Sequence, residues 1–220
     1  MTGRVTADQG PGDHISVPEA RRRREAALGG HGADATRARS FLDDPSPRVR
    51  STALGALGRL GEARVTEVTA MLADAEPLVR RRACEVAVAL VGVDLVPLLD
   101  DADPSVVEAA AWALGERRAS GHHSVEALAG VATQHADALC REAAVAALGS
   151  IGHESGLGAI LAATEDKPAV RRRAVIALAP FEGAEVDAAL DRAVADRDWQ
   201  VRQAAEDLLN AAVAEDRRTN

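Results

Sequence analysis

The sequence predicts an all-α protein built as an array of about six helical hairpins. The main observation is repetition, because the segment FLDDPSPRVRSTALGALGRL at residues 41–60 returns in altered form along the chain. Counting this segment, the chain contains six copies, at successive spacings of 30, 27, 34, 30 and 31 residues, a period typical of repeat architectures. The second observation is that the apolar residues of each copy recur at helical spacing, so each copy predicts one amphipathic helix.

The first copy shows how the predicted helix begins and ends. Asp44 and Ser46 are candidate N-caps, and Pro47 falls in the first turn, where its missing N–H costs nothing. Gly61 is suited to the left-handed position that closes a helix. The apolar stripe of this helix consists of Val49, Ala53, Ala56, Leu57 and Leu60.

A shorter apolar segment precedes each of these helices, so the repeating unit is an antiparallel pair of helices. We call the first helix of each pair the A helix and the second the B helix. Pro97 lies within the third A helix, which we expect to begin late or to bend there. The predicted A helices span 33–42, 64–73, 94–100, 123–133, 155–164 and 184–195.

The pattern L-x-D-x-x-P-x-V-R-x-x-A-x-x-A-L-G resembles the HEAT repeat, and in particular the short variety called the PBS-lyase HEAT-like repeat. The resemblance covers residues 33–214 in six copies. It implies a right-handed α-solenoid of armadillo-like type, with the B helices lining the concave side. Because the family contains both enzymes and binding scaffolds, the resemblance leaves the function open.

The chain is expected to hold one solenoid between two polar tails. Residues 1–16 are polar and aperiodic, which predicts disorder. Residues 17–29 predict an N-terminal capping helix, in a register that places Arg24 on the core stripe and aligns Leu28 with Leu57. The solenoid is predicted over 17–214, and residues 215–220 are read as a polar tail. In the last copy, Glu206 replaces an apolar residue, as a flank that faces water requires.

Composition narrows the class of protein. With no Tyr, two Trp and two Phe, the core must be built from Ala, Leu and Val. The net charge of −8 argues against a general nucleic-acid coat. Cys84 and Cys140 fall on apolar positions, so we read both as small buried hydrophobes in a reducing compartment. No apolar run is long enough for a membrane span, and we predict a cytoplasmic protein; the preference for Arg over Lys suggests a GC-rich bacterial source.

The B-helix position of Arg50 is an arginine in five of the six copies, and Val107 is the exception. A second, acidic position lies in the turn before each B helix, where the fourth copy has His135 instead. We expect the two positions to form a ladder of ion pairs between neighbouring repeats, with His135 as a cap or turn residue. The arginines are Arg50, Arg80, Arg141, Arg171 and Arg202, and the acids are Asp44, Asp74, Asp101, Glu165 and Asp196.

Metal chemistry is one alternative, since the repeat type is similar to that of deoxyhypusine hydroxylase, which binds two irons through His-Glu pairs early in its B helices. No such pair occupies these positions here, and His153-Glu154 lies between hairpins, where we expect it to begin the next A helix. His122, His123, His153 and Glu154 on one edge form a candidate metal site, which we interpret as exposed loop residues. No cofactor is predicted, and no phycobilin-lyase substrate motif is assignable.

The B-helix positions that point away from the core are the candidate binding surface. With Val49 at 0°, position 51 lies at about 200° and position 55 at about 240° around the helix. These two rows also contain Ser51 and Gly55 in the first copy. The predicted partner-binding residues are Arg81, Arg82, Glu108, Trp112, Glu142, Arg172, Arg173 and Ile176.

Three functional hypotheses remain at this point. The first is a non-catalytic, monomeric scaffold that binds another protein in its concave groove, with no membrane contact. The second is a nucleic-acid binder similar in architecture to HEAT-like alkylpurine DNA glycosylases, because Arg82 and Arg173 are three repeats apart, roughly 30 Å. Glu108 and Glu142 stand between these arginines and oppose that hypothesis. The third is a metal-dependent oxidoreductase or lyase-like enzyme.

Overall fold

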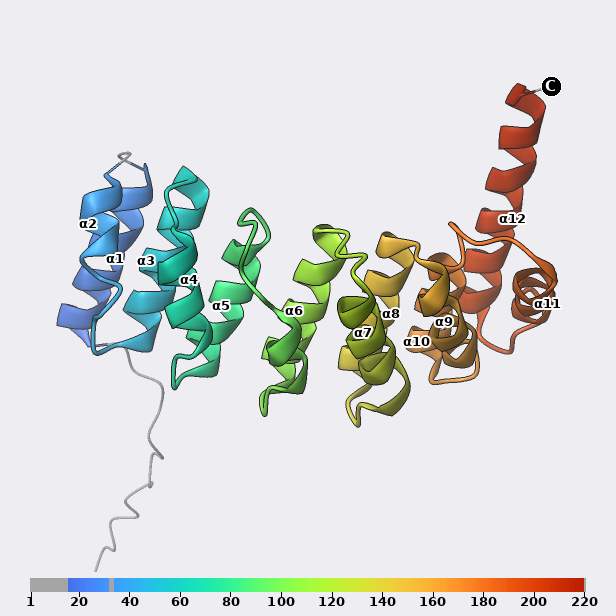
Figure 1. Cartoon of the computed structure of the whole chain (residues 1–220), viewed down its shortest axis with the longest axis horizontal. Coiled ribbons are helices and arrows are strands. Elements are labelled where there is room, and N and C mark those ends of the chain that lie inside the picture. The colour runs from blue at the N-terminus through green and yellow to red at the C-terminus, as the bar shows by residue number, and fades with distance from the viewer. Residues whose placement is uncertain (1–15, 32–33, 220) are drawn as a thin grey trace, which may run out of the picture. The chain divides into compact units, whose positions relative to one another are not determined.

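The computed structural model describes residues 16–31 and 34–219, and every regular element in this part of the chain is a helix (Figure 1). The predicted all-α fold is therefore confirmed. The chain divides into two compact units, residues 1–62 and residues 63–220, and each is described by itself. The predicted tail 1–16 lies outside the described residues except for Ser16, whereas residues 215–219 continue the last helix. A single solenoid over 17–214 stays a prediction.

Unit 1 contains α1 (Val17–His31), α2 (Ala35–Arg39) and α3 (Pro47–Leu60), and α1 packs against both other helices. The register predicted for α1 is wrong, because Arg24 is exposed and Leu28 is 48% exposed. Ala26 and Gly29 are buried instead. The reason is the close approach of the helices: a Cβ on Gly29 would lie 3.0 Å from the backbone nitrogen of Ala38, so only small residues fit there.

Unit 2 contains the remaining hairpins, and the A elements α4, α7 and α9 lie on the near side of the B helices in Figure 1. Each B helix contacts the next one along the chain. The third A element is the 3₁₀ helix η1, as expected from Pro97. The hairpins are α4 (Val65–Leu72) with α5 (Pro77–Ala87), η1 (Val96–Asp100) with α6 (Pro104–Glu116), α7 (His122–Gln134) with α8 (Ala138–Ile151), η2 (Glu154–Gly156) and α9 (Leu157–Ala163) with α10 (Pro168–Ala177), and α11 (Ala184–Ala193) with α12 (Trp199–Thr219).

Arginine–aspartate ion pairs join successive repeats, as predicted. In the pair Arg80–Asp101, Nε and Nη2 donate to the two carboxylate oxygens, both at 2.7 Å. Arg171 and Asp196 form the same bidentate pair. The expected acid of the fifth copy is corrected from Glu165 to Asp166, which accepts from Arg141 at 2.6 and 2.8 Å, because the turn before α10 is one residue shorter.

The ladder of ion pairs begins with an unexpected pair in unit 1 and is interrupted at the fourth copy. In unit 1, Arg22 of the capping helix pairs with Asp44 at 2.7 Å, so α1 also supplies a member of the ladder. In the fourth copy, His135 Nδ1 accepts the backbone N–H of Asp137 at 3.1 Å, which confirms His135 as a turn residue. Val107, at the position of the arginines, is fully buried.

Arg117 holds an irregular segment of unit 2. Helix α5 ends at Ala87, and the next A element begins only at Val96. Between them, the guanidinium of Arg117 donates to the backbone carbonyls of Ala87, Leu90 and Val93, the last two at 2.8 and 2.7 Å. Burial lowers the pKa of Arg117. The side chain, which directly follows α6, thus caps the end of α5 from the next B helix.

The B helices of unit 2 approach each other through small residues. A Cβ on Gly149 of α8 would lie 2.7 Å from both Cα and Cβ of Ala177 in α10. A Cβ on Gly115 of α6 would lie 2.8 Å from Cα of Ala147 in α8. Such distances leave no room for a methyl group, so these two glycines set the helix spacing.

Gly149→Ala is therefore expected to destabilise the protein by about 1–3 kcal/mol, since overpacking outweighs the helix-propensity gain of about 1 kcal/mol. Thermal unfolding followed by circular dichroism measures the change. Gly130→Ala is the matched control, because Gly130 lies within α7 and its Cβ would meet no atom within 4 Å. This control should gain stability. Equal shifts for the two variants would contradict the close-packing argument.

The ion pairs predict how stability depends on pH. The hydrogen bond from Arg141 lowers the pKa of Asp166 below the unfolded value of about 3.9. The stabilisation is therefore complete above the unfolded pKa and is lost as the pH falls through the folded pKa. Asp166→Asn should cost about 2–3 kcal/mol at neutral pH and should reduce the acid dependence of the unfolding free energy. Asp191→Asn is the control, because Asp191 is an exposed residue of α11; an effect as large there would refute the assignment.

Candidate functional site

Exposed large apolar side chains gather on one face of the B helices in unit 2. We call this the B-helix face: the outward positions equivalent to 47, 48, 51 and 55 on α5, α6, α8, α10 and α12. In the described part of unit 2, the other exposed large apolar residues are Val65, Val91 and Leu209. The B-helix face carries Leu78, Trp112, Leu139, Ile176 and Trp199.

A groove of about 530 Å³ lies between α6 and α8, which we call the α6/α8 groove. Trp112 and Leu139 give it an apolar wall, and these side chains are 45% and 59% exposed. Glu108 and Glu116 line its α6 side. Helix α8 contributes Glu142, Ala143, Ala146, Ala147 and Ser150, and α10 contributes Arg173.

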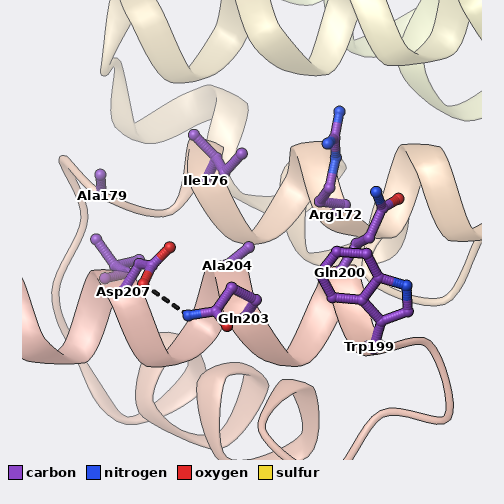
Figure 2. A pocket seen from close by; sticks show the side chains of 9 residues that line it. Arg172, Ile176, Ala179, Trp199, Gln200, Gln203, Ala204 and Asp207 are labelled. Atoms are coloured by element: carbon purple, nitrogen blue, oxygen red, sulfur yellow. Dashed lines mark hydrogen bonds between the residues drawn. The ribbon is translucent and has the colours of Figure 1, made fainter.

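A second groove of about 390 Å³, the α10/α12 groove, lies between the last two B helices (Figure 2). Arg172 and Ile176 line it from α10, and Trp199, 64% exposed, lies at the start of α12. Gln203 donates to Asp207 at 2.9 Å, as the dashed line in Figure 2 shows. Nε of Arg172 is buried without a hydrogen-bond partner.

The two grooves share a small residue at one position of the B helices. At the position equivalent to 52, α10 has Arg173, which reaches back to Glu142 of α8 at 3.4 Å. Helices α8 and α12 have Ala143 and Ala204 at this position, and each lines a groove. An alanine there leaves the charged residue of the preceding helix, Glu108 or Arg172, facing an open groove.

The predicted partner-binding residues fall into three places instead of one. Trp112, Glu108, Glu142 and Arg173 share the α6/α8 groove, and Arg172 and Ile176 line the α10/α12 groove. Neither groove includes Arg81 or Arg82, because both residues lie on α5, which lines neither groove. Both pair with Glu85 of the same helix, Arg81 at 3.3 Å.

The prediction that Ser51 and Gly55 of the first copy lie on an exposed surface is wrong. Ser51 and Gly55 are buried, because α1 packs on α3 within unit 1. Arg23 of α1 reaches the neighbouring Thr52, whose hydroxyl accepts from Nε at 3.2 Å. The outward face of α3 is thus covered by the capping helix.

Trp199 and Leu139 are functional candidates that the sequence analysis did not single out. A signal for Trp199 was present: it occupies the first position of its B helix, where Pro47, Pro77 and Pro168 begin others. A tryptophan offers no helix-starting advantage at this position, so its presence requires another explanation. Leu139 had no comparable signal, because a single exposed leucine is ordinary.

The histidines at the hairpin edge lie at the starts of A elements. His122 and His123 begin α7, and His122 Nε2 lies 3.7 Å from a carboxylate oxygen of Glu126, with both of these side chains exposed. His153 caps η2, with Nδ1 accepting the backbone N–H of Ser155 at 3.3 Å, so His153-Glu154 begins the next A segment as expected. Among the described residues, no group of three or more His, Cys, Asp or Glu side chains is arranged to hold a metal ion.

The two cysteines are buried and free, which confirms their prediction as small core residues. Burial raises the pKa of the Cys84 thiol to about 12 and that of Cys140 to about 11. Both thiols are therefore protonated at neutral pH and are poor nucleophiles. In the described part of the chain, no helix has the length and apolar character needed to cross a membrane.

Comparison with family models finds HEAT repeats along most of the chain. One model, described as HEAT repeats, matches residues 67–148, 92–179 and 125–210. A second, described as HEAT repeat, matches residues 39–63. No protein with curated annotation matches at a significant level. The narrower PBS-lyase variety stays a prediction.

Solved structures of several repeat proteins are similar. The Escherichia coli protein YibA has a TM-score of 0.67 and 18% identity, over 85% of this chain and 75% of YibA. A designed armadillo repeat protein in complex with the peptide (KR)4 has a TM-score of 0.55 and 16% identity, over 87% and 98%. Human deoxyhypusine hydroxylase in complex with glycerol has 0.46 and 22%, over 90% and 80%. Such identities show the fold alone, and the last TM-score supports no inference.

Ala143 lines the α6/α8 groove at the position where α10 has Arg173, and this difference can be tested. Ala143→Arg should pair with Glu108 and close the α6/α8 groove, as Arg173 does with Glu142 in the next space. A double-mutant cycle with Glu108→Gln should give a coupling of about 0.2–1 kcal/mol in the free energy of unfolding, the usual range for part-exposed pairs. If Ala143→Arg and Glu108→Gln show no coupling, or if the Ala143→Arg variant does not fold, Ala143 is not the residue that keeps the groove open.

Proposed function

This chain belongs to the HEAT repeat family, and we propose that it is a non-catalytic scaffold that binds a segment of a partner protein along the B-helix face of residues 63–220. The supporting observation is the concentration of exposed apolar side chains around two open grooves. The chain has two tryptophans; Trp112 lines the α6/α8 groove and Trp199 lines the α10/α12 groove. Exposed aromatic residues beside arginines are the residue types that most often dominate protein interfaces.

The spacing of the grooves suits a short extended segment. Successive B helices of unit 2 are in contact, and packed helices lie about 8–10 Å apart. The α6/α8 and α10/α12 grooves are two helices apart, or roughly 16–20 Å. At about 3.3 Å per residue, five or six extended residues span this distance. One segment of a partner can therefore reach both tryptophans.

The reactive side chains elsewhere in the described chain are engaged in its structure, which supports binding over catalysis. The cysteines are buried with raised pKa values, and His153 and His135 serve turns. The armadillo neighbour, designed and bound to (KR)4, supports the idea that a fold of this kind holds a peptide on its surface. The nucleic-acid alternative gains no support, because Arg82 and Arg173 pair with glutamates. We further propose a monomer in the cytoplasm, where the free cysteines stay reduced.

Affinity capture with the full chain, quantified by mass spectrometry after nuclease treatment, tests the proposal. Trp112→Ala and Trp199→Ala should each weaken capture of the same protein by about thirtyfold, because truncation of an interface hot spot costs about 2 kcal/mol or more. Val91→Ala is the matched control, since Val91 is exposed and lies off the B-helix face.

Circular dichroism of each variant separates binding from folding. Both tryptophan variants should keep the helical spectrum and unfold within a few degrees of the wild type. Capture that is undiminished when Trp112→Ala and Trp199→Ala are combined in one variant would refute the proposal that the partner binds on the B-helix face. If Trp112→Ala unfolds the protein, Trp112 belongs to the core and the α6/α8 groove is not a binding site.

A further inference from the structure

The α6/α8 groove has an excess of negative charge. Glu108, Glu116 and Glu142 line it, and Arg173 is the one basic residue among its lining. Arg173 is bonded to Glu142, whereas Glu108 and Glu116 have no ion-pair partner among the described residues. Both of these side chains are exposed. Two carboxylates of the groove are thus left for a ligand to neutralise.

These carboxylates flank Trp112 on a single helix. Glu108, Trp112 and Glu116 follow at intervals of four residues on α6, so they form one stripe along the groove. Neighbours at this spacing lie about 5–6 Å apart at Cβ. A cation over the indole ring therefore lies within reach of a carboxylate on either side. Leu139 on the facing helix supplies an apolar surface for the stem of such a side chain.

We infer, on the basis of the proposed function, that the partner segment inserts a Lys or Arg side chain into the α6/α8 groove. The cation lies on the face of Trp112, where the ring quadrupole attracts it, and between the carboxylates of Glu108 and Glu116. The aliphatic stem packs on Leu139. The charge of the groove is complementary to this side chain and opposes an acidic one.

The α10/α12 groove provides a comparison within the same chain. It also contains an exposed tryptophan, yet its charged residues are Arg172 and Asp207, and Gln203 already donates to Asp207. It lacks a pair of carboxylates around its indole. A basic side chain should therefore prefer the α6/α8 groove.

Single-tryptophan variants allow each groove to be read by fluorescence. The chain has two tryptophans and no tyrosine, so Trp199→Phe leaves Trp112 as the reporter, and Trp112→Phe leaves Trp199. Each variant is titrated with the synthetic peptides (KR)4, (ED)4 and (QS)4. Trp112 should respond saturably to (KR)4 and not to (ED)4 or (QS)4, and the affinity should fall as salt is raised. Trp199 should respond to (KR)4 at least about fivefold more weakly.

Neutral variants identify the carboxylates that are involved. Glu108→Gln with Glu116→Gln, in the Trp112 reporter, should weaken (KR)4 binding about five- to tenfold, the effect expected of two exposed ion pairs. Glu182→Gln with Glu206→Gln is the control of equal net charge, since both residues are exposed and line neither groove. Ala143→Arg, which places a guanidinium in the groove, should abolish the response.

Three outcomes of the peptide titration would overturn the inference: no saturable response of Trp112 to (KR)4, an equal response to (ED)4, or equal losses in the groove and control double variants. The last outcome would indicate attraction to the acidic chain as a whole. A captured partner that requires Trp112 but has no Lys or Arg in its bound segment would overturn this inference and leave the scaffold proposal intact. If partner capture is unchanged when both tryptophans are replaced, the scaffold proposal is wrong, and this result is independent of the outcome of the (KR)4 titration.

Discussion

The bidentate ion pair between an arginine of one B helix and an aspartate in the turn of the next repeat is the constraint on which this structure depends. Asp101 accepts from Arg80 and also from the backbone N–H of Asp103, at the start of its own helix α6. Asp196 does the same for Arg171 and Asp198. One carboxylate therefore joins two repeats and shapes a turn, and such charge-assisted bidentate bonds are among the stronger ones in proteins. For α6 and α12, the link to the preceding repeat and the start of the helix are therefore set by the same carboxylate.

Helix spacing then follows from small residues, and the grooves follow from the spacing. Gly115 and Gly149 permit backbones to approach so closely that little volume remains between neighbouring B helices below the surface. At the surface, the residue at the position equivalent to 52 differs from helix to helix. Arg173 bonds Glu142 across the space between α8 and α10, whereas Ala143 and Ala204 each line an open groove. The grooves are thus shaped by surface side chains, while the close contacts of the glycines lie below them.

The distribution of chemistry in the chain is consistent with recognition as its role. Most reactive side chains are engaged in structure: the thiols are buried, His135 and His153 accept backbone bonds, and the ladder arginines are paired. The exposed aromatic side chains lie on the B-helix face beside charges of both signs. Such a surface gains free energy by burying aromatic area and gains specificity from where its charges lie.

The sequence by itself determined the repeat, the class of fold, the starts of the B helices at Pro47, Pro77, Pro104 and Pro168, and the burial of both cysteines. These features depend on spacing along one chain segment, which a repeating pattern records. Only the tertiary structure decided that Asp166 and not Glu165 pairs with Arg141, that Ala26 and Gly29 face the core of unit 1, and that Trp199 shares a groove with Arg172. Each of these depends on which side chains of two different elements meet, and a shift of one residue in a turn or a helix changes that meeting without changing the pattern.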